Sequence, residues 1–472
     1  MIPRKTKIIC TIGPVTSSVE NLVKLINAGM DVARLNFSHG KHEDHLEMIQ
    51  NIREASKIAG KNIPIMQDLQ GPKIRTGKLI NNAVELKDDQ EFIITTNELE
   101  LGNEFKVGTT YPELHKDVHG SRTLLLDDGY IILEITKVVG KDIHTRVIKG
   151  GILKNNKGII APGATFSTPT LSDKDLEDLR FGLNSGVDVV ALSFIRNVKD
   201  IYELKTAMKI FGRSVAVVAK IELPDAVKNI IEIIRETDGV MVARGDLGLE
   251  LPPEKLPLLQ KEIIGRCNYD GKPVITATQM LESMIYNPRP TRAEASDVAN
   301  AVIDGSDCVM LSGETSIGRY PFDTVEYMSK IIKTVEEKYY TKNSRHRIKI
   351  KPSDDVFDAM GSASCQIADQ INAAAIVALT SSTFTTKNIA KFRPRIPIIG
   401  VTDDEVIQRR LNFVWGVNSI LAPNTNEDFD FNDIRQMLLE FDYINSGDTI
   451  VFVAGLSPNL EKAHNVIRIY QV

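Results

Sequence analysis

The strongest constraint on the fold is a rhythm of short apolar segments, each followed by a longer amphipathic stretch. Segments of this length that stay apolar throughout are typical of strands buried on both faces of a sheet. The strand-like segments are Lys7–Thr11, Asp31–Asn36, Pro64–Leu69, Asp188–Phe194, Ser214–Ile221, Gly239–Arg244, Pro273–Met280 and Cys308–Ser312. Helical patterns lie between them, as at Val19–Ala28, Asp225–Ile234 and Arg292–Ile303. The alternation predicts an α/β protein built on a closed (β/α)8 barrel, the TIM barrel.

Polar or ionisable residues follow the ends of these segments. They are Asn36, Ser38, Asp68, Ser193, Lys220, Glu222, Asp246, Thr278 and Ser312. Such groups are unfavourable in a packed, apolar barrel interior, whereas barrel active sites are built at the carboxyl ends of the strands. The pattern therefore predicts a single site at that end of the barrel.

Two other regions depart from the barrel rhythm. From about Pro72 to Thr165 the pattern alternates, and Asp128-Gly129 is a hairpin signal, so we expect a small inserted β-barrel lid. After a polar, basic stretch beyond Tyr340, α/β alternation resumes and predicts a C-terminal α/β open-sheet domain. The expected domains are a barrel domain A at 1–70 and 166–342, a lid domain B at 71–165, and a domain C at 343–472.

Composition excludes several classes of protein. The 472 residues carry 57 basic and 62 acidic side chains, a net charge of −5, which argues against nucleic-acid binding. No apolar run approaches the roughly 20 residues of a membrane span, and no signal sequence follows the start, so we expect no membrane partner and a cytoplasmic location. Cys10, Cys267, Cys308 and Cys365 are far apart beside apolar segments, which predicts buried, reduced thiols.

Two segments carry arginines suited to phosphate. Arg34, in DVARLNFSHG, lies inside a buried strand, where it serves either a structural ion pair or a phosphate clamp; the sequence leaves both open. In QDLQGPKIRTG, Asp68 at a strand end is a candidate cation ligand and Arg75 a candidate for a second phosphate. Neither G-x-x-x-x-G-K-[ST] nor G-x-G-x-x-G occurs, so side chains and metal must hold any phosphates.

Three further segments end on candidate site residues. Lys220 and Glu222 in AKIEL are two apart on a strand and share a face, where an ion pair between them is the simpler alternative. Gly245-Asp246 follows a buried strand and offers free amides beside a carboxylate. Thr278 in PVITATQMLESM has a hydroxyl that suits either a substrate carboxylate and proton relay or an ordinary core position.

Two clusters of titratable residues are assigned to structure. His39, His42 and His45 do not form H-E-x-x-H and are interpreted as an ordinary helix start. The acidic run at 354–358 is interpreted as the first turn of a helix.

Taken together, KIICTIGP, DVARLNFSHG, QDLQGPKIRTG, AKIE, MVARGDLG, ATQMLESM, MLSGET and RPRIPIIGVT resemble the pyruvate kinase family, in order and over nearly the whole chain. The resemblance implies a phosphotransferase that converts phosphoenolpyruvate and ADP to pyruvate and ATP, the last step of glycolysis. It also implies Mg²⁺ or Mn²⁺ as cofactor, allosteric regulation and a homotetramer.

The resemblance also implies roles for the reacting groups. Arg34 and Arg75 would contact the transferring phosphoryl group and the nucleotide phosphates. Glu222 and Asp246 would hold the divalent metal, and Lys220 would stabilise the phosphoryl group in flight. Such cations are needed because two unit charges about 4 Å apart repel by roughly 4 kcal/mol at an effective dielectric of 20.

Two further sets of positions carry over from the family. Thr278 and the amides of Gly245 and Asp246 would bind the substrate carboxylate, and the Thr278 hydroxyl, with water, would protonate the enolate. The family's monovalent-cation site would comprise Asn36, Ser38, Asp68 and Leu69.

The chain departs from the family pattern at three places, one of them the lid return, where the family's K-G-V-N-L-P-G is KGIIAPG at 157–163. The family reads D-T-K-G-P-E where this chain has Asp68 to Lys73, so the Lys73 ammonium would replace K⁺ and the enzyme would not require that ion. The family's hydroxyl-rich effector loop is partly matched by Thr380, Ser381, Ser382, Thr383 and Thr385, which a simple turn before a helix would also explain, and 459–465 lacks the glycines of its partner loop. This argues against fructose 1,6-bisphosphate and leaves another phosphorylated effector open.

Two alternative functions make different demands on the sequence. Another phosphoenolpyruvate or pyruvate barrel enzyme, such as an aldolase or a mutase, would need neither ADP nor an inserted lid. A catalytically silent metabolite sensor would show decay at Lys220, Glu222 or Asp246, and all three are intact.

Overall fold

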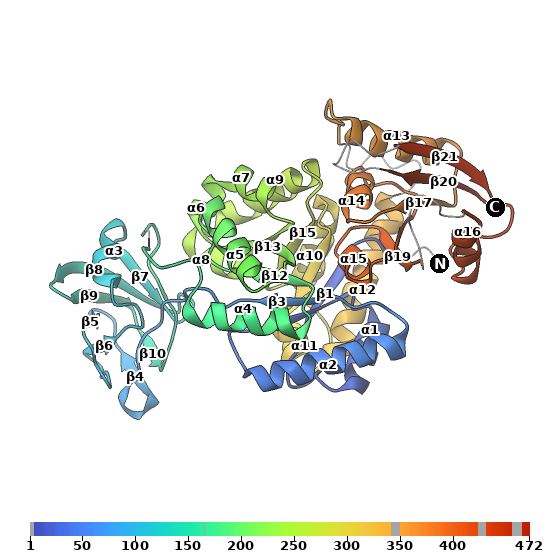
Figure 1. The fold of residues 1–472 in the computed structure, drawn as a ribbon. Helices are drawn as coiled ribbons and strands as arrows, with labels where there is room; N and C mark the ends of the chain where they lie inside the picture. The colour runs from blue at the N-terminus through green and yellow to red at the C-terminus, as the bar shows by residue number, and fades with distance from the viewer. Residues whose placement is uncertain (1–3, 165, 341–349, 423–430, 456–464) are drawn as a thin grey trace.

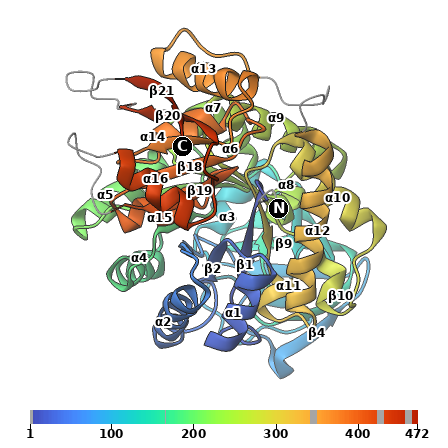
Figure 2. The ribbon, with the colours of Figure 1, turned by 90° about the vertical axis from the view of Figure 1, so that its right-hand side faces the viewer.

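The computed structural model describes residues 4–164, 166–340, 350–422, 431–455 and 465–472. Figure 1 shows three bodies in a row, with the inserted sheets at the left, the barrel in the middle and the C-terminal α/β part at the right. Figure 2, seen from the C-terminal side, shows the outer helices arranged around the barrel strands. Within the described ranges, no helix is both long enough and apolar enough to cross a lipid bilayer.

Eight parallel strands close into the central barrel, as the apolar rhythm predicts. They are β1 (Lys7–Thr11), β2 (Val32–Asn36), β3 (Ile65–Asp68), β12 (Val189–Leu192), β13 (Ala216–Ile221), β14 (Gly239–Ala243), β15 (Val274–Ala277) and β16 (Cys308–Leu311). Nearly every strand residue is buried, because one face fills the barrel interior and the other packs against helices. Each expected segment overlaps its strand.

Helices alternate with the strands along the chain. They are α1 (Val19–Ala28), α2 (His42–Ala59), α4 (Asp173–Ser185), α5 (Val198–Ile210), α6 (Pro224–Lys228), α7 (Ile230–Glu236), α8 (Arg244–Glu250), α9 (Leu256–Tyr269), α10 (Arg292–Asp304), α11 (Gly313–Ser316) and α12 (Pro321–Tyr339). The single helix expected over Asp225–Ile234 is wrong. Asn229 divides it into α6 and α7, and the Asn229 side chain donates to the carbonyl of Arg196 at 2.9 Å.

The insertion after β3 folds as a curled six-stranded sheet and a small two-stranded one. Its elements are β4 (Ala83–Leu86), β5 (Glu91–Thr95), β6 (Lys106–Gly108), α3 (Leu114–Asp117), β7 (Thr123–Leu126), β8 (Ile131–Val139), β9 (Asp142–Lys149), β10 (Gly151–Lys154) and β11 (Ile159–Ile160). The expected hairpin is confirmed. Leu126 pairs with Ile131, and Asp127, Asp128 and Gly129 all have positive φ, as a tight turn of this hand requires.

The described residues of the C-terminal part form a five-stranded sheet in the order β19-β18-β17-β20-β21. Its elements are α13 (Val356–Gln370), β17 (Ala375–Leu379), α14 (Phe384–Ala390), β18 (Ile398–Thr402), α15 (Glu405–Leu411), β19 (Val417–Leu421), α16 (Phe431–Glu440), β20 (Thr449–Ala454) and β21 (Val466–Gln471). β19 was not expected, because VNSIL carries polar residues suited to a half-exposed edge strand.

The C-terminal part closes the end of the barrel opposite the lid. Phe413 belongs to the same apolar cluster as barrel residues such as Met66 and Ile275. The buried Arg393 guanidinium lies 3.0 Å from the Asp307 carboxylate and stacks over Trp415 at 4.9 Å. All four cysteines are buried and free, as expected. The basic stretch at 341–349 lies outside the described residues.

Candidate active site

Lys220 lies at the centre of a buried ionic cluster at the mouth of the barrel. Its ammonium is 2.9 Å from Glu222 Oε1 and 3.1 Å from Asp68 Oδ1, and it donates to Ser193 Oγ at 2.7 Å. β13 ends at Ile221, so Glu222 lies one residue beyond the strand that carries Lys220. The ion pair between them is also present. Both carboxylates are only 1 % exposed, so they hold the ammonium with little screening by water.

The cluster sets the protonation of its members. Burial alone would lower the pKa of Lys220, but Asp68 and Glu222 outweigh it and raise that pKa above its ordinary value. Burial opposes the charge of Asp68, yet Lys220 and Arg34 bring its pKa below the usual one. Burial raises the pKa of Glu222 to about 7, with Lys220 opposing and Asp246 adding to the shift. The mouth thus holds one firmly charged lysine and one carboxyl that titrates near neutrality.

Arg34 takes the first of its two alternatives, the structural ion pair. Its Nε lies 2.7 Å from Asp68 Oδ2, and Nη1 donates to Thr11 Oγ1 at 2.8 Å. Because Asp68 bridges Arg34 and Lys220, the two cations are held side by side. An arrangement of this kind leaves the phosphate role of Arg34 open, since a paired guanidinium still presents positive charge to the mouth.

The four expected monovalent-cation residues lie on adjacent chain segments at β2 and β3. Asn36 and Asp68 are register partners, and the Asn36 side chain accepts from the Ser38 amide at 3.2 Å. Leu69 is buried, and its carbonyl accepts from Ser193 Oγ at 2.7 Å. The Lys73 ammonium lies 3.8 Å from Asp246 Oδ1, a residue outside this set of four.

Thr278 and Gly245 meet between β15 and α8. The Gly245 amide donates to Thr278 Oγ1 at 2.9 Å, and that hydroxyl donates to the Ala277 carbonyl at 2.7 Å. Thr278 has φ +67°, a conformation that is costly for a β-branched residue. Arg244 holds it there by donating to the Thr278 carbonyl, and Arg244 is itself anchored by Asp297 at 2.7 Å.

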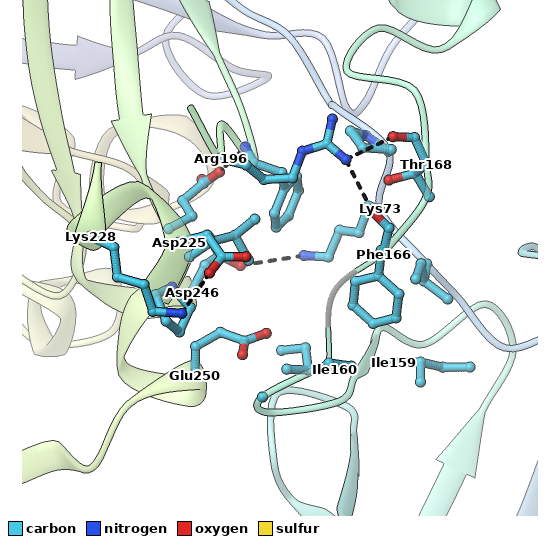
Figure 3. Close-up of a pocket in the computed structure, with 18 residues that line it drawn as sticks. Lys73, Ile159, Ile160, Phe166, Thr168, Arg196, Asp225, Lys228, Asp246 and Glu250 are labelled. Atoms are coloured by element: carbon cyan, nitrogen blue, oxygen red, sulfur yellow. Dashed lines mark hydrogen bonds and ion pairs between the residues drawn. The ribbon is translucent and has the colours of Figure 1, made fainter. Parts of the chain in front are cut away.

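A cavity of about 960 Å³, counted with its open mouth, separates this cluster from the lid. Figure 3 shows Asp225, Asp246 and Glu250 on the barrel side of the cavity, with Ile159, Ile160 and Phe166 on the other. Burial, together with Asp225 and Asp246, raises the pKa of Glu250 to about 7. One wall of the cavity therefore carries three carboxylates, of which Asp225 pairs with Lys228 at 2.8 Å, and the opposite wall is apolar.

Arg75 lies at the root of the lid, apart from the Lys220 cluster. Its backbone pairs with Gly158, and its guanidinium donates to the Asn156 carbonyl at 3.0 Å. Its charge is nevertheless close enough to the mouth to affect His39, as the charges of Lys73 and Arg34 are. Burial, and then Arg75, Lys73 and Arg34, lower the pKa of His39. These cations form an electropositive rim.

Sequence reasoning missed Arg196, which holds the segment that leads from the lid back into the barrel. Its guanidinium donates to the carbonyls of Phe166 and Thr168 at 3.0 and 2.9 Å and pairs with Asp200 at 3.1 Å. The available signal was an arginine just beyond the polar end of a barrel strand. Glu250 and Asp225 were also missed, since acidic residues in loops and on helix surfaces are too common to single out.

The remaining clusters behave as structure. His42 opens α2 and its ring lies 2.7 Å from Asp178, while His45 stacks on Phe37. Asp355 caps α13, and Asp358 lies in its first turn, as expected. Asp358 also forms an ion pair with the buried Lys391 at 2.6 Å.

The hydroxyl-rich loop follows β17. Thr380 and Thr385 are buried, Ser381 and Ser382 are exposed, and Thr380 Oγ1 donates to the Ser382 carbonyl at 2.9 Å. Its expected partner loop at 459–465 lies almost wholly outside the described residues.

Comparison with known proteins decides the family. The pyruvate kinase barrel domain matches residues 3–325, and the pyruvate kinase alpha/beta domain matches 358–470. The chain belongs to the pyruvate kinase family. The pyruvate kinase of Geobacillus stearothermophilus is 45% identical over 98% of this chain and 80% of its own length. That of Corynebacterium glutamicum is 43% identical over 99% and 97%.

A solved structure agrees with these relatives. A pyruvate kinase from Cryptosporidium parvum superposes with a TM-score of 0.91 and 38% identity, covering 99% of this chain and 96% of that one. The resemblance inferred from the motifs is confirmed, and so are the expected fold class and the assignment as a phosphotransferase. Membership in the pyruvate kinase family argues against an aldolase or a mutase.

The residues present fit the divalent metal that the family generally uses. Glu222 and Asp246 both line the cavity, and burial together with repulsion from Asp246 outweighs Lys220 and raises the Glu222 pKa to about 7. Among the described residues, no group of three or more His, Cys, Asp or Glu side chains could hold a metal. Two carboxylates suit Mg²⁺, which commonly takes its other ligands from water and substrate phosphates.

Proposed function

We propose that this chain transfers the phosphoryl group of phosphoenolpyruvate to ADP at the barrel mouth, giving pyruvate and ATP. The observation that carries the assignment of roles is the Lys220 ammonium, fixed between Asp68, Glu222 and Ser193 on rigid strand ends. A cation held this way costs no reorganisation when charge moves from donor to acceptor.

The electropositive rim brings the two polyanions together. Arg34, paired with Asp68, contacts the transferring phosphoryl group, and Arg75 at the lid root contacts the nucleotide phosphates. Each cation offsets part of the repulsion between the phosphates, which would otherwise keep donor and acceptor apart. Arginine suits this task because its planar fork matches phosphate oxygens.

Glu222 and Asp246 hold Mg²⁺ or Mn²⁺. The ion, when bound, neutralises phosphate oxygens and orients them for in-line transfer. Glu222 Oε2 also accepts from the Phe194 amide at 2.6 Å, which fixes the carboxylate in place. The protein's own contribution is thus a pair of carboxylates aimed at one side of the mouth.

Thr278 serves the pyruvate half of the reaction. The amides of Gly245 and Asp246 and the Thr278 hydroxyl bind the substrate carboxylate. The hydroxyl then delivers a proton, with water, to the enolate carbon after the phosphoryl group has left. Arg244 is a positioning residue, because it holds the strained Thr278 backbone.

The lid limits the competing reaction with water. Arg196 ties residues 166–168 to the barrel beside α5, so closure of the lid has a fixed pivot. The apolar side chains of Ile159, Ile160 and Phe166 then cover the wall that carries the three carboxylates. Covering the mouth excludes water and favours ADP as the acceptor.

Activity is independent of K⁺. Lys73 replaces a carboxylate of the family pattern and brings a fixed positive charge into the cavity, 3.8 Å from Asp246. In buffer with a large organic counter-ion and no K⁺, we expect full turnover. A many-fold rescue on adding K⁺ would count against the proposal, and Lys73→Glu is expected to create K⁺ dependence.

Three further features complete the proposal. Domain A comprises 1–70 and 166–342, domain B 71–165 and domain C 343–472. The enzyme is a homotetramer regulated allosterically by a phosphorylated effector at the loop of Thr380, Ser381, Ser382, Thr383 and Thr385. Titrating sugar phosphates and nucleotides against the phosphoenolpyruvate saturation curve tests the effector, and analytical ultracentrifugation tests the assembly.

The main test is formation of pyruvate and ATP from phosphoenolpyruvate, ADP and Mg²⁺ by the purified chain. We expect pyruvate to appear only when ADP is present and in equal amount to ATP. Pyruvate without ADP would indicate a different barrel chemistry, and binding of phosphoenolpyruvate without turnover would indicate a sensor.

A further inference from the structure

A second cavity lies at the floor of the barrel, the end opposite the candidate active site. Its volume is about 490 Å³, counted with its open mouth. The apolar walls come from the amino ends of adjacent strands and the residue before β15, namely Val189, Ala216, Val218, Ile275 and Pro273. Helices α14 and α15 of the C-terminal part supply the other side, and Figure 1 shows both between the barrel and the C-terminal sheet.

Two cations and one carboxylate line this cavity. Lys387 comes from α14, Arg410 from α15 and Asp238 from the residue just before β14. Among the described residues, neither Lys387 nor Arg410 has a carboxylate within ion-pair distance. The Lys387 ammonium makes a long hydrogen bond of 3.5 Å to the Asp238 backbone carbonyl, and Asp238 Oδ2 accepts from the Val217 amide at 2.9 Å.

The other carboxylates near the floor are already engaged. Asp307 pairs with Arg393 at 3.0 Å, and Asp188 pairs with Arg53 and Arg409, each at 2.7 Å. The lining of the cavity therefore retains one net positive charge, from Lys387 and Arg410 against Asp238.

The two cations are also poorly satisfied where they stand. Arg410 Nε is buried without a hydrogen-bond partner in the described part of the chain, and Nη2 reaches the Ser214 carbonyl only at 3.4 Å. Burial lowers the pKa of Arg410 and lowers the pKa of Lys387 to about 8. Both residues are half-buried, and charges that are partly withdrawn from water without partners are costly, so an anion between them would be favoured.

We propose that this floor cavity binds a small organic monocarboxylate, with its carboxylate between Lys387 and Arg410 and its apolar body against Val218 and Ile275. One negative charge matches the net charge of the lining. A phosphate would leave the apolar walls uncovered and place a second charge near Asp238. The inference does not rest on phosphoryl transfer, and the ligand class differs from that proposed for the hydroxyl-rich loop, although Thr383 lines the cavity as well.

A ligand in the floor cavity would contact both the barrel and the C-terminal part of the chain. Phe413 lines the cavity and also packs into the barrel interior with Met66 and Ile275. A bound carboxylate would therefore contact α14, α15 and the barrel strands at once. Since a ligand that binds only the folded state stabilises it, the melting temperature should rise with ligand concentration.

The test is calorimetric titration of the full-length protein with benzoate, 3-methylbutanoate and inorganic phosphate as separate probes. We expect saturable 1:1 binding of at least one carboxylate, and loss of affinity by about tenfold or more in both Lys387→Met and Arg410→Gln. The matched control is Lys351→Met, an exposed lysine of the same part of the chain, which should bind like the parent.

A second measurement guards against loss of the fold in the variants. Without ligand, Lys387→Met should melt at or above the temperature of the parent, because it removes a poorly partnered charge. Three outcomes would overturn the proposal. They are no saturable carboxylate binding up to about 20 mM, unchanged affinity in both variants, or phosphate as the only probe whose binding the variants abolish.

Discussion

The two ends of the same barrel treat charge in opposite ways. At the mouth, Lys220 pairs with both Asp68 and Glu222, and the pKa of Glu222 is raised to about 7. Thr278, also at the mouth, has a strained backbone. At the floor, Asp307 is satisfied by Arg393 and by the amides of Val274 and Trp415. Phe413 packs into the barrel interior there, and Lys387 and Arg410, beside the floor cavity, lack a carboxylate partner among the described residues.

The difference shows where the fold tolerates unfavourable electrostatics. Carboxyl ends of parallel strands converge on one small region, so polar side chains there repel or polarise each other unless a ligand intervenes. Amino ends can be covered by another domain, and charges there are stabilising only when fully paired. Mutations at the mouth should therefore affect chemistry most, and mutations at the floor should affect stability most.

The largest effect is expected at the mouth, for Lys220→Met. Removing the ammonium takes away the charge proposed to meet the phosphoryl group, and kcat should fall by about 10³-fold or more. Steady-state assays with phosphoenolpyruvate and ADP measure it, with the half-exposed Lys261→Met on α9 as the control. If kcat falls less than about tenfold, the mouth is not the reacting centre that the comparison requires.

At the floor, Asp307→Asn should cost stability instead. The change removes the negative charge that Arg393 meets at 3.0 Å in a buried site, so the free energy of unfolding should drop by about 3–5 kcal/mol. Urea unfolding measures the drop, and Asp323→Asn at the exposed start of α12 should cost less than about 1 kcal/mol. A loss of kcat per folded molecule, with stability retained, would contradict the division between the two ends.

The third prediction uses pH to probe the mouth. Burial raises the pKa of Glu222 from 4.5 to about 7, so in metal-free protein its stabilising effect is complete below pH 4.5 and is lost as pH rises through 7. Divalent cations bind the deprotonated form, and affinity should rise about 50-fold between pH 5 and pH 7.

Titration with Mn²⁺ followed by electron paramagnetic resonance measures that affinity. Glu222→Gln should bind weakly with a much flatter pH profile, while Glu250→Gln should keep a steep one. Affinity independent of pH in the parent protein would show that Glu222 is already ionised and that the mouth is less strained than inferred.

The smallest effect is expected for Phe413→Leu, which changes the ring that packs into the barrel interior at the floor. The apolar volume is largely kept, so unfolding should become easier by no more than about 1.5 kcal/mol. The kcat should stay within about twofold of the parent value. A larger change in kcat would show that the floor and the mouth are coupled through the barrel interior.

Much of the fold could be predicted because buried parallel strands leave a strong periodic signal. β1 begins and ends at the residues that the sequence indicates, and the other seven barrel strands each overlap their expected segment. The short lid strands β6 and β11 were missed, because two or three residues are too few for alternation to register. The edge strand β19 was missed because its polar residues face solvent.

Some residues of the candidate site could likewise be predicted from the sequence, and others could not. The motifs identified Lys220, Glu222 and Thr278, since polar residues at the ends of apolar strands are rare enough to notice. They could not identify Arg196, whose carbonyl partners at Phe166 and Thr168 are about 30 residues away, nor the contact of Lys73 with Asp246. Such contacts join segments that local patterns treat as unrelated.

The amino-acid sequence by itself determined the barrel, the insertion after its third strand and the chemical types gathered at one end, because burial and side-chain spacing act locally along the chain. Only the tertiary structure decided which charges face each other. It paired Arg34 with Asp68, turned Lys73 to Asp246, and left Lys387 and Arg410 together beneath the barrel. Electrostatic energy depends on distances through space, and those distances exist only once the chain has folded.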